Sequence, residues 1–153
     1  MKSIFKKDDV VKVDILVASI GGEFGGVWNF TDIPEEGREK VIKDISVDGG
    51  ILSYEEVTFE FSNPSWSTLQ DLKRSSSSIV DSEVVLNIEE FHIKAFMALL
   101  KDWTLSDDEG KKIEVLRSLG TGRLTMETLG HIDSINVKIM KCVSVELSSK
   151  ILN

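Results

Sequence analysis

The chain is poor in the residues that build metal centres and disulfides. Cys142 is the one cysteine among 153 residues, so an intramolecular disulfide is impossible and a zinc site built from cysteines is excluded. The two histidines, His92 and His131, lie far apart in the sequence, and neither belongs to a His-Glu-x-x-His motif. We therefore expect no metal and no cofactor, and we assign no catalytic residue.

Long apolar runs and basic clusters are also lacking. No stretch reaches the roughly 18–20 apolar residues that a membrane-spanning helix needs, and no apolar run follows the first lysines as it would in a secretory signal. The net charge is −8, with no basic stripe that could hold phosphates. These absences predict a protein that binds neither nucleic acid nor membranes. We expect it in a reducing cytoplasm, or in a particle assembled there.

Two segments invite a ligand-binding interpretation that their spacing does not support. The glycine-rich segment 21–26 lacks the G-x-G-x-x-G spacing, and no Gly-Lys-Ser/Thr follows it. The acidic segment 106–110 looks like part of a calcium loop. However, Leu105 and Leu116 would then stand at the first and twelfth ligand positions, where oxygen ligands are needed. A flexible loop and a solvated turn are the better interpretations.

The first half of the chain has the alternation that is typical of strands. Around residue 57, the apolar side chains Val57, Phe59 and Phe61 alternate with polar ones. Pro64 ends this run because proline cannot continue a hydrogen-bonded ladder, and Ser65 can cap the helix that follows. The patterns predict strands over 10–18, 27–31 and 52–62, short helices over 35–44 and 66–74, and a turn at 48–50.

The second half has helical periodicity. Asn87 and Glu90 form a capping-box-like start, and the helix that they open carries an apolar stripe as far as Trp103. Apolar residues at spacings of three or four over 124–151 predict one long terminal helix. The four serines at 75–78 predict a polar, flexible break and a candidate hinge.

Strands in one half and helices in the other predict an α+β fold. We expect an N-terminal antiparallel sheet with a short helix, followed by a helical C-terminal half. The strand-rich part would span residues 1–74 and the helical part residues 79–153. The length favours one compact domain with the serine-rich break between the parts.

The tryptophans are the best candidates for partner contacts. Trp103 ends an apolar helical stripe, so core packing is its expected role. Trp28 and Trp66 adjoin loops, where they could anchor a partner, although core packing is the favoured alternative. The apolar stripe of the terminal segment is longer than a small domain must cover. An uncovered part would support homo-oligomerisation or the binding of another polypeptide.

One segment resembles a known family. Residues 91–113 contain a helix with the pattern Leu-Leu-x-x-Trp, a turn with the pattern Leu-Thr/Ser-Asp-x-Asp/Glu-Gly, and then more helix. The matching residues are Leu99, Leu100, Trp103, Leu105, Asp107, Glu109 and Gly110. This arrangement resembles phage tail proteins of the tail assembly chaperone type. The resemblance covers about residues 53–150 and leaves out residues 1–50.

The resemblance implies binding and no enzymatic activity. A tail assembly chaperone holds the tape-measure protein and recruits tail-tube subunits, in the host cell cytoplasm during assembly. Two alternatives stay open: a structural virion subunit or adaptor of the tail or neck, and a small enzyme whose site the sequence does not show. The candidate partner-contacting residues are Phe24, Trp28, Trp66, Leu99, Trp103 and Leu105.

Overall fold

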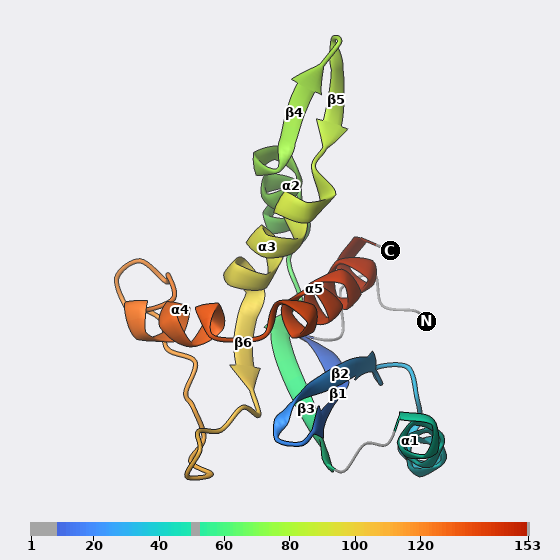
Figure 1. The fold of residues 1–153 in the computed structure, drawn as a ribbon. Helices are drawn as coiled ribbons and strands as arrows, with labels where there is room; N and C mark the ends of the chain where they lie inside the picture. Colours follow the sequence, from blue (N-terminus) through green and yellow to red (C-terminus); the bar gives the residue numbers. More distant parts are fainter. Residues whose placement is uncertain (1–8, 50–52, 153) are drawn as a thin grey trace, which may run out of the picture.

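A computed structural model describes residues 9–49 and 53–152 (Figure 1). It confirms the α+β class, with an antiparallel sheet built mainly from the first half and helices concentrated in the second. In chain order the elements are β1 (Val10–Ile20), β2 (Glu23–Asn29), α1 (Glu35–Gly49), β3 (Ser53–Ser62), α2 (Trp66–Ser75), β4 (Ser77–Val80), β5 (Glu83–Leu86), α3 (Ile88–Leu99), β6 (Leu100–Trp103), α4 (Met126–Asp133) and α5 (Val137–Leu152).

The main sheet has the strand order β2-β1-β3-β6, and each neighbouring pair is antiparallel. The register of β1 on β3 places Val13 opposite Phe59 and Ile15 opposite Val57. All four side chains are buried, because they point to the face that α3 and α5 cover. The alternation along β1 and β3 therefore predicted the buried face correctly.

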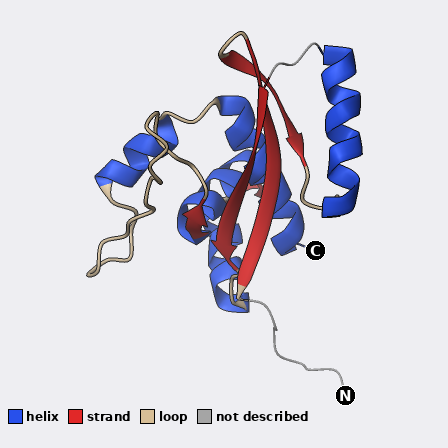
Figure 2. Ribbon diagram, turned by 90° about the horizontal axis from the view of Figure 1, so that it is seen from below, coloured by secondary structure: helices blue, strands red, loops and turns tan. Residues whose placement is uncertain are grey.

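The opposite face of the sheet holds α1. Figure 2 shows this helix on the other side of the sheet from the remaining helices. Arg38 of α1 donates to the Asp14 carboxylate at 3.0 Å and to the backbone oxygens of Phe30 and Ile33. Asp14 also accepts from the Thr58 hydroxyl at 2.7 Å. This half-buried network attaches α1 to the two central strands.

The helix starting after Asn87 is shorter than its apolar stripe predicts. It ends at Leu99, and residues 100–103 form β6 at the edge of the sheet. Leu100 lies opposite Phe61 and Trp103 lies opposite Phe59. The prediction of helix as far as Trp103 was wrong: residues 100–103 pair with β3, and this pairing buries both side chains.

The terminal segment is two helices. Helix α4 ends at Asp133 and α5 begins at Val137. Between them, the Ser134 hydroxyl donates to the Gly130 carbonyl, and the Asn136 side-chain oxygen accepts from the Lys138 amide at 2.9 Å. These side-chain bonds compete with the helical ladder, so the single long helix predicted over 124–151 was wrong.

The serine-rich segment 75–78 joins α2 to β4 with no irregular loop between them. Ser75 is the last residue of α2, Ser76 is buried, and β4 begins at Ser77. Strands β4 and β5 form a hairpin that projects from the body of the molecule (Figure 1). Its turn is Asp81-Ser82, with φ of 50° and 66°, which fits a two-residue type I′ turn.

Smaller differences concern the ends of elements. Strand β2 begins at Glu23, so only Gly21 and Gly22, both with positive φ, form the turn before it. Helix α1 runs past the predicted 35–44 as far as Gly49, which places the first two residues of the predicted turn at 48–50 in a helix. The third, Gly50, lies outside the described residues.

The hydrophobic core draws on both halves of the chain. Phe59 and Phe61 of β3 pack against Phe96 of α3, with ring centroids 6.1 Å and 5.3 Å apart. Val143 and Leu147 of α5 belong to the same buried cluster. Strands from the first half and helices from the second thus meet in one core.

Candidate functional site

Two of the six candidate partner-contacting residues lie in the core. Leu99 and Trp103 are 4% and 1% exposed. The Trp103 ring meets Phe59 edge to face at 6.1 Å, and its indole nitrogen donates to the Ile113 carbonyl at 2.7 Å. The core role expected for Trp103 is confirmed. In this conformation these two side chains offer almost no surface to a partner.

The other four candidates are more accessible but are not gathered into one patch. Phe24 and Trp28 are half-buried on β2, and Leu105 is half-buried after β6, where it packs against the core. Trp66, the first residue of α2, is 77% exposed. Trp66 is therefore the one candidate that presents most of its side chain to solvent, and the core packing favoured for it was wrong.

A groove between α3 and α5 was not predicted. It encloses about 460 Å³ and is lined mainly by apolar side chains from both helices. Four of these are substantially exposed: Ile88 and Ile93 on α3, and Val137 and Val145 on α5. We call this surface the α3–α5 groove.

The two helices form the groove because each is apolar on more than one face. Helix α3 buries Phe91, Ala95 and Phe96 in the core, while Ile93 points elsewhere and is 59% exposed. Helix α5 buries a stripe that includes Val143 but leaves Val137 80% exposed. A surface helix needs one apolar stripe. The isoleucines and valines outside that stripe were the signal in the sequence that could have predicted the groove.

The groove also contains three side chains with catalytic potential: Glu89, His92 and Ser144. Burial lowers the pKa of His92, and the nearby charge of Glu89 partly opposes this shift. Neither Glu89 nor Ser144 forms a hydrogen bond with His92 in the described part of the chain. Among all residues that the structure describes, no cluster of histidine, cysteine or carboxylate side chains could hold a metal ion.

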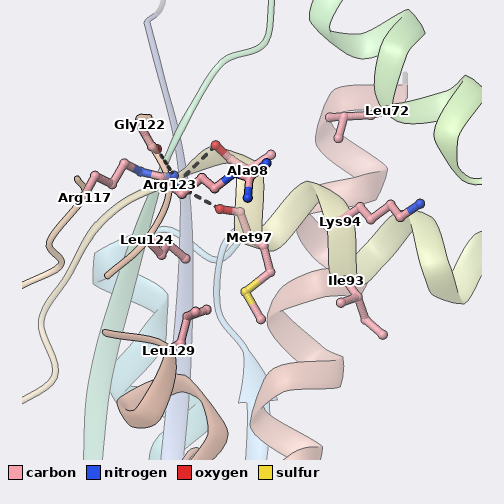
Figure 3. A pocket seen from close by; sticks show the side chains of 10 residues that line it. All are labelled: Leu72, Ile93, Lys94, Met97, Ala98, Arg117, Gly122, Arg123, Leu124 and Leu129. Atoms are coloured by element: carbon pink, nitrogen blue, oxygen red, sulfur yellow. Dashed lines mark hydrogen bonds between the residues drawn. The ribbon is translucent and has the colours of Figure 1, made fainter. Parts of the chain in front are cut away.

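A second cavity lies on a neighbouring face of α3 and shares Ile93 with the α3–α5 groove. It encloses about 600 Å³ between α2, α3 and residues 117–129, and Figure 3 shows its lining. Leucines and Met97 supply the apolar surface, and Lys94, Arg117 and Arg123 supply the charge. Over residues 9–49 and 53–152, no acidic side chain lines this cavity. We call it the basic pocket, and its charge contrasts with the net charge of −8 for the chain.

Arg117 holds one wall of the basic pocket in place. Its guanidinium donates to the carbonyl oxygens of Met97, Ala98 and Leu100 at 2.8–3.2 Å, and to that of Gly122 at 2.9 Å. The first three lie at the end of α3, where carbonyls lack helical partners. Arg117 therefore caps α3 and fixes the 117–124 loop against it.

The β4–β5 hairpin is the third accessible apolar surface. Ile79 and Val84 lie opposite each other and are each 76% exposed. Val80 and Val85, on the other face, are 52% and 45% exposed. A two-stranded hairpin is only marginally stable by itself, so one that is apolar on both faces suits contact with another molecule.

Comparisons with known proteins identify no family for the chain. Compared with protein-family models, with curated proteins and with solved structures, it matches none of them. Among the described residues, no helix combines the length and the apolar character that crossing a membrane requires.

Proposed function

We propose that this protein is a non-enzymatic phage tail protein that binds another polypeptide in the α3–α5 groove. Assembly chaperone is the leading role, with the tape-measure protein as the bound polypeptide and tail-tube subunits as further partners. The observation that carries the proposal is the exposed apolar lining of the groove, in particular Ile93 and Val137. The assignment to phage tails rests on the sequence resemblance over residues 53–150.

The shape of the groove suits an amphipathic helix. Two helices with apolar side chains between them bind such a helix through anchors spaced three or four residues apart. Burying one valine or isoleucine side chain on binding contributes about 1.5–3 kcal/mol, and the ordering of the partner offsets part of this. Four exposed anchors can therefore support moderate, reversible binding, which suits a chaperone that must release its client.

A structural subunit or adaptor of the virion is the second candidate. The projecting β4–β5 hairpin favours it, because an arm with apolar residues on both faces suits permanent contact with a neighbouring subunit. The two candidates differ in where the protein is found. A chaperone is present in infected lysate and absent from purified particles, whereas a structural subunit remains in the particle.

The groove itself is tested by Val137→Glu in the tagged full chain. Val137 is the first residue of α5, so a carboxylate there is compatible with folding because it lies at the positive end of the helix dipole. Met126→Glu is the matched control: Met126 is the first residue of α4, is 84% exposed, and does not line the groove.

The measurement is affinity purification from infected cells followed by mass spectrometry. Wild type and Met126→Glu are expected to retain the tape-measure and tail-tube proteins, and Val137→Glu to lose the tape-measure protein. Equal recovery of the tape-measure protein with all three would contradict the groove as its binding site. Absence of the tape-measure protein from the wild-type sample would contradict the chaperone role.

A further inference from the structure

The β4–β5 hairpin and the basic pocket have complementary chemistry. The hairpin turn and its flank carry Asp81 and Glu83, and residues 77–86 contain no basic side chain. The basic pocket is lined by three cationic side chains and, among the described residues, by no acidic one. The hairpin face that carries Glu83 also exposes Val80 and Val85, and leucines with Met97 supply apolar surface in the pocket.

One cation of the pocket is available for a partner. Lys94 already pairs with Glu90 at 2.7 Å and donates to the Ser75 carbonyl, and Arg117 is occupied by backbone oxygens. The guanidinium of Arg123, by contrast, makes no hydrogen bond or ion pair with any described residue. It lies exposed at the pocket, where it can receive a carboxylate.

We propose that the hairpin of one copy of this chain docks in the basic pocket of a second copy. The hairpin does not occupy its own pocket, because it points away from the body of the molecule, whereas α3 and residues 117–129 line the pocket lower in the body (Figures 1 and 3). Val80 and Val85 enter the pocket, and Glu83 on the same face of the hairpin meets Arg123. Complementarity of both charge and apolar surface favours a second copy over a basic or uncharged partner.

This contact joins two different surfaces, so it is head-to-tail. Repetition of such a contact gives a ring if the rotation between copies closes and a filament if it does not. The basic pocket and the α3–α5 groove share Ile93, but Val137 and Val145 line only the groove, so Val137→Glu alters the groove without altering the pocket. Self-association therefore goes beyond the proposed function and is tested separately from it.

The test exchanges the charges of the proposed pair in the full chain. Glu83→Arg and Arg123→Glu each create a like-charge contact, and each is expected to weaken self-association at least about tenfold, measured by sedimentation equilibrium. The double variant is expected to restore association. An equimolar mixture of the two single variants is also expected to associate. In that mixture the altered hairpin of one variant meets the altered pocket of the other with opposite charges, and the unaltered surfaces meet as they do in wild type.

Lys40→Glu is the matched control, since it reverses an exposed charge on α1, away from both surfaces. It is expected to associate as wild type does. A wild-type chain that stays monomeric at about 0.1 mM would overturn the proposal. So would equal weakening by Lys40→Glu, or a mixture of single variants that associates no better than either variant alone. Because Val137 does not line the basic pocket, Val137→Glu is expected to self-associate as wild type does, whatever the outcome for the client groove.

Discussion

The contrast between two tryptophans gives the sharpest test of the fold. Both Trp103 and Trp66 were candidates for partner contact, but the first is 1% exposed and the second 77% exposed. Replacing each with phenylalanine removes the same atoms and the same N–H donor. The structure assigns very different effects on stability to these identical changes.

The cost of Trp103→Phe has two parts. Loss of buried volume next to Phe59 costs about 1–2 kcal/mol. The Ile113 carbonyl accepts from the indole in the wild type at 2.7 Å and loses this donor in the variant. The loss adds only about 1–2 kcal/mol, because Ile113 is half-buried and water can partly replace the indole N–H. The total loss of unfolding free energy is about 2–4 kcal/mol. For Trp66→Phe the expected change is within about 0.5 kcal/mol.

Urea unfolding followed by far-ultraviolet circular dichroism measures both changes, because it does not depend on tryptophan fluorescence. Both variants should keep the wild-type slope of free energy against urea. A loss below about 1 kcal/mol for Trp103→Phe would refute its placement in the core. A comparable loss for Trp66→Phe would refute the exposed position of that residue.

Three further predictions concern single side chains. Arg117→Met keeps the apolar stem but removes the hydrogen bonds at the end of α3. It is expected to lower the free energy of unfolding by about 2–3 kcal/mol in the same urea assay. A loss below about 0.5 kcal/mol would contradict the capping of α3 by Arg117. The pKa of His92 is lowered by burial, so the folded state favours the neutral imidazole and loses stability as pH falls below the usual pKa near 6.5. His92→Gln should therefore lose less stability than wild type between neutral and acidic pH, and equal losses would contradict this. Burial, reinforced by Glu146, raises the pKa of the Cys142 thiol, so a thiol reagent at neutral pH should react more slowly with the native chain than with the chain in denaturant.

Local signals predicted much of the fold correctly. Ser65 and Asn87 cap α2 and α3, with side-chain oxygens that accept from Thr68 and Glu90 amides. Alternation along β3 identified its buried face. These features succeeded because they depend on neighbours in the sequence, where hydrogen bonds and side-chain direction repeat with a fixed period.

Features that depend on distant residues were missed. Leu100 and Trp103 fit a helical stripe as well as a strand, and only the presence of β3 beside them decides for β6. The β4–β5 hairpin had a local signal, since β-branched residues flank Asp81-Ser82, but its turn lacks the glycine that type I′ turns favour. The isoleucines and valines outside the core stripes indicated uncovered helix faces, but only the fold brings α3 and α5 together to form one groove.

The proposed binding of another polypeptide in the α3–α5 groove is tested most directly by site-specific crosslinking. A photoreactive amino acid replaces Val137 in the groove or, in the control, Met126 outside it, and both chains are irradiated in infected cells. The account predicts a crosslink to the tape-measure protein from position 137 and none from position 126. No crosslink to the tape-measure protein from position 137, or the same crosslink from both positions, would contradict it.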